Sequence, residues 1–328
     1  MSNLWFSYST QSGIDAFKPL NSPYSITYNV AHYLRERAPE IGYTFQYVNL
    51  DDTTPQTFGK DDIAVGHTWW DGGFMHQALD ADIRAKIILQ PYSRYMVSEP
   101  DIPMVLTLWN KADSLLLITG EHWWSGIADS PYAALKAQKT RVDMALDSSI
   151  HVYQKERWNP VGKRNFLIIG NDIWAKGFEH IAELARAAGI RIGHAGHMND
   201  DTFQHVPQFT SYGGIIFEPN NQRAIANEYD FFLSIANADA NPTTLLETSA
   251  WGLVAACNVE SGYLPNRPFI ELRKGDLQYN LEVIDMLQRT SEYNLRKRSR
   301  MVREVIEKEY TWQRFNATVW KEIEKWVK

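Results

Sequence analysis

The chain has 328 residues, enough for two domains that each bury a hydrophobic core. Its formal net charge of −6 argues against nucleic acid as the main partner. A single cysteine, Cys257, excludes a disulfide framework and fits a reducing compartment, and no apolar run approaches the length of a membrane span. We therefore expect a cytoplasmic protein with at most peripheral membrane contact.

The first half of the chain alternates short apolar runs with helical patterns. Residues 4–8 read as a first strand, and a loop over 9–23 carries Gly13. A helix is expected over 24–36 because its apolar residues recur on one face, and a second strand over 45–49. Alternation of this kind predicts a doubly wound parallel sheet.

Three more short apolar runs, at 63–66, 86–89 and 115–119, predict further strands, each followed by a polar or aromatic loop. Ligands bind at the carboxyl ends of parallel strands, which makes the loop side chains candidates for ligand contact. The candidates are His67, Trp69, Tyr92, Arg94 and His122. For His67, a hydrogen-bonded loop histidine is an equally good interpretation.

The middle of the chain predicts a boundary. A helix is expected over 133–146 and a short strand over 150–153, and the polar stretch 154–163 contains Pro160 and Gly162. We interpret that stretch as a linker between a first domain, 1–153, and a second domain, 164–310. The last helix, 311–328, places its apolar residues on one side: Trp312, Phe315, Val319, Ile323 and Trp326.

The second domain opens with an apolar strand over 165–170 that ends in Gly170. Asn171 follows, then Lys176 and Gly177, then a helix that ends at Gly189. A lysine beside a helix start can serve phosphate as a mobile point charge, although a solvent-facing lysine explains it as well.

The stretch 230–258 predicts a strand, a polar loop, a helix from Thr243 to the C-cap Gly252, and another strand. A helix start offers N–H groups and a positive dipole end to an anion. Asp239 before the helix and Glu247 within it, eight positions on, would accept hydrogen bonds from sugar hydroxyls. The combination indicates a sugar nucleotide, and the alternative is an ordinary turn with two solvated carboxylates.

The spacing Asp239-x7-Glu247, together with Lys176-Gly177, resembles the signature of retaining glycosyltransferases of the GT-B fold, family four (glycosyl transferases group 1). The resemblance implies an α/β protein with two Rossmann-like doubly wound domains that face a cleft. The chain departs from the family where Asp239 replaces a glutamate and Asn171 replaces an arginine, for which Arg94 or Arg164 could substitute. The final helix would pack back on the first domain.

Site roles follow from the resemblance. Lys176 and Asp239 are the expected catalytic residues. The expected donor contacts are Gly13, Gly170, Asn171, Lys176, Phe217, Asp239, Asn241, Pro242, Thr243, Thr244, Leu245 and Glu247. The loop candidates of the first domain, His67, Trp69, Tyr92, Arg94 and His122, become the expected acceptor contacts.

The expected activity is transfer of a sugar from a nucleoside diphosphate sugar to a glycan, a lipid-linked acceptor or a small molecule. No metal and no cofactor are expected, and the resemblance implies retention of anomeric configuration. An inactive GT-B protein that only binds sugar or nucleotide, a sugar-nucleotide epimerase and a pyridoxal-dependent phosphorylase stay open as alternatives. A basic run at 296–303 is interpreted as a solvated helix face in preference to a lipid contact.

Overall fold

The computed structural model describes residues 2–8, 25–50, 52–68, 72–199, 201–214, 218–264 and 268–327. The predicted contacts Gly13, Trp69 and Phe217 lie outside these ranges. The chain forms two compact units: Met1–Thr119, Trp124–Asp143 and Trp312–Lys328 make up the first, and Gly120–Trp123 and Met144–Thr311 the second. No helix in the described ranges is long and apolar enough to cross a membrane.

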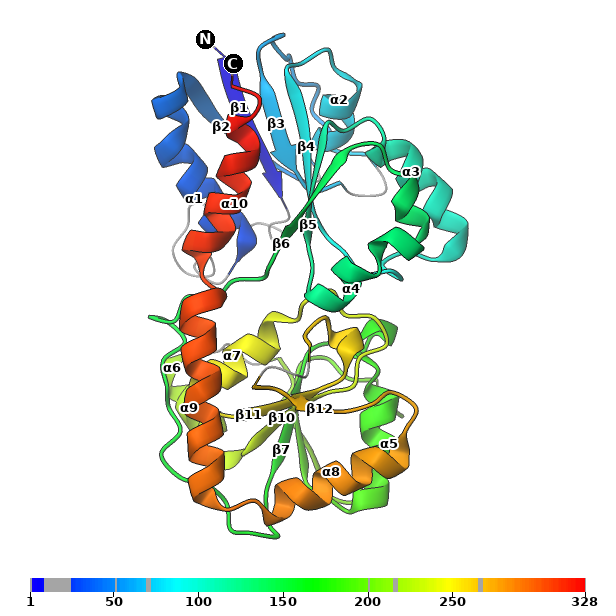
Figure 1. Ribbon diagram of the computed structural model, residues 1–328, viewed down its shortest axis with the longest axis vertical. Helices are drawn as coiled ribbons and strands as arrows, with labels where there is room; N and C mark the ends of the chain where they lie inside the picture. The colour runs from blue at the N-terminus through cyan, green and yellow to red at the C-terminus, as the bar shows by residue number, and fades with distance from the viewer. Residues whose placement is uncertain are drawn as a thin grey trace. The chain divides into compact units, whose positions relative to one another are not determined.

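The first unit is built on a six-stranded parallel sheet in the order β2-β1-β3-β4-β5-β6 (Figure 1). Its strands are β1 (Ser2–Tyr8), β2 (Tyr43–Asn49), β3 (Ile63–Gly66), β4 (Ala85–Pro91), β5 (Ser114–Ile118) and β6 (Gln138–Val142). Its helices are α1 (Ile26–Arg37), α2 (Phe74–Asp80), α3 (Ile102–Trp109) and α10 (Trp312–Glu324). A short helix, α4 (Glu121–Ser125), follows β5.

Helix α10 belongs to the first unit and is fixed to its sheet by packing and by one buried acid. Phe315, Val319 and Ile323, three of the five apolar residues that predicted the helix, are buried. Glu322 is also buried and accepts hydrogen bonds from Ser114 Oγ at 2.6 Å and Lys325 Nζ at 2.7 Å. These partners are needed because a buried carboxylate without them would destabilise the fold.

The second unit holds a second six-stranded parallel sheet, ordered β12-β11-β10-β7-β8-β9. Its strands are β7 (Phe166–Ile169), β8 (Ile192–Ala195), β9 (Phe209–Ser211), β10 (Phe231–Ser234), β11 (Val254–Cys257) and β12 (Ile270–Glu271). Its helices are α5 (Phe178–Ala188), α6 (Pro219–Glu228), α7 (Thr243–Trp251), α8 (Leu277–Arg289) and α9 (Glu292–Glu309).

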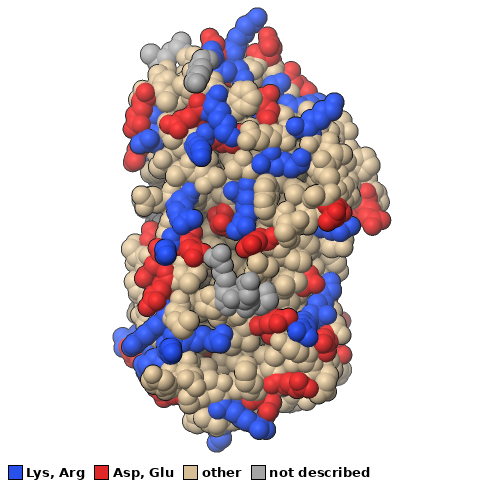
Figure 2. All heavy atoms as spheres, viewed as in Figure 1, with Lys and Arg blue, Asp and Glu red and all other residues tan. Residues whose placement is uncertain are grey.

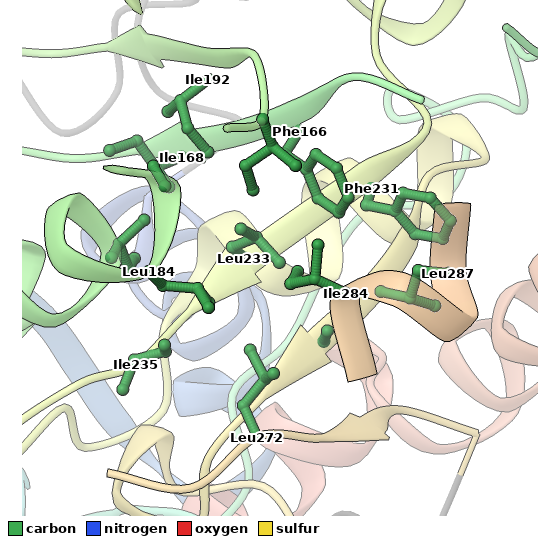
Figure 3. Close-up of a cluster of buried hydrophobic side chains, with 14 of the residues drawn as sticks. Phe166, Ile168, Leu184, Ile192, Phe231, Leu233, Ile235, Leu272, Ile284 and Leu287 are labelled. Carbon is green, nitrogen blue, oxygen red and sulfur yellow. The ribbon is translucent and has the colours of Figure 1, made fainter. Parts of the chain in front are cut away.

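The core of the second unit explains why its strands are apolar at nearly every position. Phe166 and Phe231 stack at 5.1 Å between ring centroids on adjacent strands, and Leu184 and Ile284 reach the same cluster from α5 and α8 (Figure 3). Because helices cover the sheet, all four residues of β7 and of β10 are buried. The apolar runs that predicted these strands are therefore core residues.

The structure corrects two predicted elements. Residues expected to form a helix over 133–146 instead make a single 3-10 turn, Pro131–Ala134, and strand β6. This edge strand pairs only with β5 and reads Gln-Lys-Thr-Arg-Val, so it lacks the apolar run that marks a buried strand. The strand expected over 150–153 does not form.

The polar stretch expected to be a linker is an ordered part of the second unit. Lys155 is buried, and its ammonium bonds to the carbonyl oxygen of Tyr229 at 2.5 Å and to Asp230 at 3.2 Å. Asn159 donates to the same carboxylate. Residues 144–163 all fall in the second unit, whereas the limits expected from sequence began that domain at 164.

Candidate functional site

The candidate site lies at the carboxyl edge of the second unit's sheet. Strands β7 and β10 are parallel neighbours, with Phe231 opposite Phe166, so the loops that follow them emerge side by side. These two loops are joined directly, since the backbone N–H groups of Asn237 and Ala238 both donate to the carbonyl oxygen of Ala175, at 3.0 and 3.1 Å. The contact brings together the two segments singled out in the sequence.

Lys176 and Asp239 form an ion pair at this junction. The Lys176 ammonium lies 2.5 Å from Asp239 Oδ2, and the two side chains are only 22% and 15% exposed. Partial burial strengthens the attraction because less water screens the charges. The two residues expected to be catalytic are therefore in contact, and their roles stay a prediction.

Two glycines make room for this lysine. Gly177 has φ +60°, and a Cβ there would lie 2.2 Å from the carbonyl oxygen of Ile235, so only glycine allows the backbones to approach. Gly170 has φ +136°, and a Cβ there would lie 3.3 Å from Lys176 Cε. The Lys-Gly pair seen in the sequence thus has a steric explanation.

Asn237 locks the loop in place and was missed by sequence reasoning. Its Nδ2 donates to the carbonyl oxygen of Trp174 at 2.8 Å and to Glu179 Oε1 at 2.6 Å, and its Oδ1 lies 3.1 Å from His180 Nε2. The only sequence signal is a polar amide directly after an apolar strand. That signal does not reveal its partners, which lie in the preceding loop and helix.

The backbone of Asp239 is held from both sides. Its N–H donates to the carbonyl oxygen of Glu260 at 2.9 Å, and its carbonyl accepts from Trp123 Nε1 at 2.7 Å. Trp123 belongs to the short segment Gly120–Trp123 that is part of the second unit. The sequence marked Trp123 only as one of an aromatic pair, and its anchoring role appears only in the structure.

Helix α7 begins beside this ion pair with an open amino terminus. Pro242 is its N-cap and no described side chain caps it, while the N–H of Leu245 is used by the carbonyl of Pro242 at 3.3 Å. The N–H groups of Thr243 and Thr244 have no acceptor inside the helix. The hydroxyl of Thr244 is buried and has no hydrogen-bond partner among the described residues. This corner can therefore offer several donors to an anion.

Glu247, on the second turn of α7, completes the cluster. Burial raises the pKa of its carboxyl from an ordinary 4.5 to about 7, and the nearby Lys176 ammonium partly opposes the shift. Lys176 is thus close to both carboxylates that the sequence pattern set eight positions apart. The structure brings Lys176, Asp239 and Glu247 together at one helix start.

Other predicted donor contacts have structural roles. Asn241 Oδ1 accepts from Met144 N–H at 3.2 Å and from the Tyr263 hydroxyl at 3.1 Å, so it fastens the loop before α7. The side chain of Leu245 is fully buried in the core. Asn171 is exposed, and its Oδ1 accepts from the N–H of His197 at 3.2 Å.

Arg164 is excluded as the substitute for the missing family arginine. It precedes β7 and so lies at the strand end opposite Gly170. Its guanidinium is buried and donates to the carbonyl oxygens of Asn159 and Thr290. A residue held in this way cannot reach the carboxyl edge of the sheet.

Of the predicted acceptor contacts, His67 and Tyr92 follow strands β3 and β4 of the first unit as expected. His67 is largely buried against the Tyr8 ring, 5.2 Å away, and burial lowers its pKa to about 4, so it is neutral at physiological pH. Tyr92 has no exposed surface, and its hydroxyl donates to Ser130 Oγ at 3.2 Å. This placement favours core packing for Tyr92.

The two remaining described candidates differ in setting. Arg94 is exposed in the first unit, with its guanidinium 5.8 Å from the centroid of the Tyr95 ring. His122 belongs to the second unit, where burial lowers its pKa while Glu260 opposes that shift. The roles of these residues as acceptor contacts stay a prediction.

Comparison with solved structures defines the fold class as GT-B, an α/β architecture with two parallel sheets and flanking helices. Sucrose-phosphate synthase from Thermosynechococcus elongatus is similar with a TM-score of 0.67 at 10% identity, covering 98% of each chain. HepE from Anabaena, solved in complex with UDP, is similar with a TM-score of 0.65 at 6% identity, and the match covers 98% of this chain and 100% of the HepE chain.

TarM from S. aureus gives a TM-score of 0.61 at 10% identity and covers 81% of this chain. This chain spans only 55% of the TarM length. No protein-family model matches the sequence, and no curated protein matches it. The likeness at such low identity establishes the fold.

The two glycines that bound α5 allow a matched test of the close approach at Gly177. Gly177 and Gly189 have nearly the same φ, +60° and +63°, but a Cβ at 189 would meet nothing within 4 Å. Alanine at either position should lower the free energy of unfolding by about 1–2 kcal/mol, because its side chain disfavours the left-handed backbone. Gly177→Ala should cost about 1–3 kcal/mol more through overpacking. Equal losses in urea denaturation would show that the close approach is unimportant.

The raised pKa of Glu247 predicts a pH-dependent stability. Its proton stabilises the fold fully below pH 4.5, and this contribution is lost as pH rises through about 7. The Glu247→Gln side chain stays neutral. Between pH 5 and pH 8 the free energy of unfolding of this variant should therefore rise by about 1–3 kcal/mol relative to that of the wild type. Chemical denaturation without nucleotide measures this difference. The exposed Glu183→Gln is the control, and parallel behaviour of the two variants would refute the shift.

Proposed function

We propose that this chain is a glycosyltransferase whose second unit binds a nucleoside diphosphate sugar. The observation that carries the proposal is the cluster of Lys176, Asp239 and Glu247 at the open amino terminus of α7. A diphosphate needs positive charge and N–H donors, whereas a ribose and a hexose need acceptors for their hydroxyls. The cluster offers both within one corner.

The diphosphate would bind at the start of α7. The Thr243 and Thr244 N–H groups and the positive end of the helix dipole attract it, and the buried Thr244 hydroxyl can donate one more bond. Lys176 now neutralises Asp239, so an incoming phosphate competes for the same ammonium. Drawing the ammonium toward phosphate would free Asp239 to accept a bond from a donor sugar hydroxyl.

The nucleoside would be held through Glu247. Its carboxylate lies one helical turn into α7 and can accept bonds from the two ribose hydroxyls. In the ligand-free protein this carboxyl is costly to ionise, because burial raises its pKa to about 7. Bonds from ribose would stabilise the ionised form of this carboxyl.

In the transfer step, the bond between the sugar anomeric carbon and the diphosphate oxygen breaks, and its electron pair leaves with the nucleoside diphosphate. An acceptor hydroxyl oxygen forms the new bond to that carbon, and its proton passes to the diphosphate oxygen that leaves. Lys176 and the start of α7 would stabilise the charge that develops on the leaving diphosphate. We propose that this stabilisation acts without a metal ion and that the anomeric configuration is retained.

Several structural neighbours support these assignments by analogy. HepE was solved with UDP, and the pneumococcal O-GlcNAc transferase GtfA with UDP and GlcNAc. A study of trehalose-6-phosphate synthase concerns glycosyl transfer with retention. We accordingly propose a uridine nucleotide as the first donor to test. The acceptor is left to the general class of glycans, lipid-linked sugars and small hydroxyl compounds.

The second candidate is a protein that binds the nucleotide sugar without transferring it. The observation in its favour is Asn171, which stands where an arginine would face the diphosphate and bonds instead to the backbone of His197. Without an arginine at position 171, the leaving nucleoside diphosphate would be less stabilised. Donor hydrolysis separates the candidates, because a pure binder shows affinity for UDP-sugars and no release of UDP.

Removing the proposed ribose contact should weaken nucleotide binding. Glu247→Ala should reduce UDP affinity by roughly 1–3 kcal/mol, since a charged hydrogen-bond acceptor is lost. Calorimetry at pH 8, where the wild-type carboxyl is mostly ionised, measures the effect. Glu183→Ala on the exposed face of α5 is the matched control. A Glu247→Ala affinity equal to wild type would reject the ribose role.

Lys176→Ala should lower turnover by about 10²–10³-fold, because a charge facing the leaving diphosphate disappears. UDP release from a UDP-sugar measures the rate, and circular dichroism checks the fold. Lys176→Arg keeps the charge and should retain more activity than the alanine variant. Full turnover in Lys176→Ala would contradict a catalytic role.

A further inference from the structure

The first two thirds of α9, residues 292–303, are strongly basic in a chain that is acidic as a whole. Five cationic side chains and one carboxylate lie between Glu292 and Arg303, against a net charge of −6 for the chain. The helix turns Leu295, Ser299 and Val302 into the unit. The cations therefore lie on the sides and on the outward face, and Figure 2 shows Lys and Arg side chains gathered over α9 at the lower left.

Helical spacing defines one outward surface, which we call the α9 basic face: Tyr293, Arg296, Lys297, Arg300 and Met301. Arg296 pairs with Glu292 at 2.5 Å. Lys297 and Arg300 are exposed and form no ion pair within the described ranges. Arg300 lies four residues from Arg296 and three from Lys297, and like charges at these spacings repel. Helix stability therefore gives no reason for this arrangement.

Large apolar side chains lie among these charges. Tyr293 is 75% exposed and Met301 is 48% exposed. Met301 also lines a groove of about 590 Å³, together with Pro268 and Val305. Arg298 and Lys308 border this groove, as do Glu304 and Glu309. Cations next to an exposed aromatic ring and a methionine are typical of surfaces that lie on a bilayer.

We propose that the α9 basic face binds the surface of anionic lipid bilayers. Lys297 and Arg300 would lie among the phosphates, while Tyr293 and Met301 enter the interface. Nucleic acid is disfavoured because Glu304 and Glu307 end the basic face within a few turns, which leaves few cations to neutralise a phosphate backbone. This inference uses no residue of the donor site and stands independently of the proposed function.

Sedimentation of the full chain with vesicles tests the proposal. Vesicles containing phosphatidylglycerol should bind the protein, those of phosphatidylcholine alone should not, and binding should fall as salt is raised. Each cation near the surface contributes about fivefold. Lys297→Glu combined with Arg300→Glu should therefore weaken binding by at least about 25-fold, and Tyr293→Ala severalfold. Lys60→Glu combined with Lys274→Glu, at exposed lysines elsewhere, is the charge-matched control.

Equal binding to both vesicle types would overturn the proposal, as would equal losses in the test and control double variants. Binding of an RNA homopolymer without binding of vesicles would also overturn it and assign the face to nucleic acid. If the charge-reversal variant melts early, Lys297→Gln with Arg300→Gln removes the charges without introducing new ones. UDP affinity, measured in parallel, should be unchanged, so failure here leaves the donor site unaffected.

Discussion

The ion pair between Lys176 and Asp239 is the contact on which the candidate site depends. It joins the loops after β7 and β10, and it exists because Gly177 lets the backbone of the first loop lie against Ile235 of the second. The attraction between the Lys176 ammonium and the Asp239 carboxylate therefore stabilises the contact between the two loops. The same ammonium is the charge that we propose a diphosphate binds.

The rest of the site is a frame around this contact. The loop that carries Asp239 is held by hydrogen bonds with Asn237, Trp123 and the carbonyl of Glu260. The backbone that positions the Asp239 carboxylate is therefore fixed. Glu247 and the Thr244 hydroxyl are poorly satisfied in the same corner, since one is hard to ionise and the other is buried without a described partner. Rigid backbone beside unsatisfied polar groups is the pattern expected of a binding site.

Much of the fold could be predicted from the sequence because most strands are buried on both faces. The apolar runs at β1, β3, β7 and β10 follow from helices covering the sheets, and Gly252 ends α7 with φ +112° as the C-cap pattern implied. Prediction failed at β6, where burial is low and polar residues fill an edge strand. The prediction of a strand over 150–153 was also wrong. The chain there has no regular secondary structure, and the residues that follow it are fixed by buried side-chain contacts such as that of Lys155 with Asp230.

For the site, the sequence by itself determined the chemical groups and their spacing along the chain: a lysine before a helix-flanking glycine, and two carboxylates around a helix start. Local rules suffice for these features, because capping and helix periodicity act over a few residues. Only the tertiary structure decided that Lys176 meets Asp239, that Trp123 anchors its carbonyl and that burial raises the pKa of Glu247. Each of these depends on segments distant in sequence, which are brought together by the parallel pairing of strands.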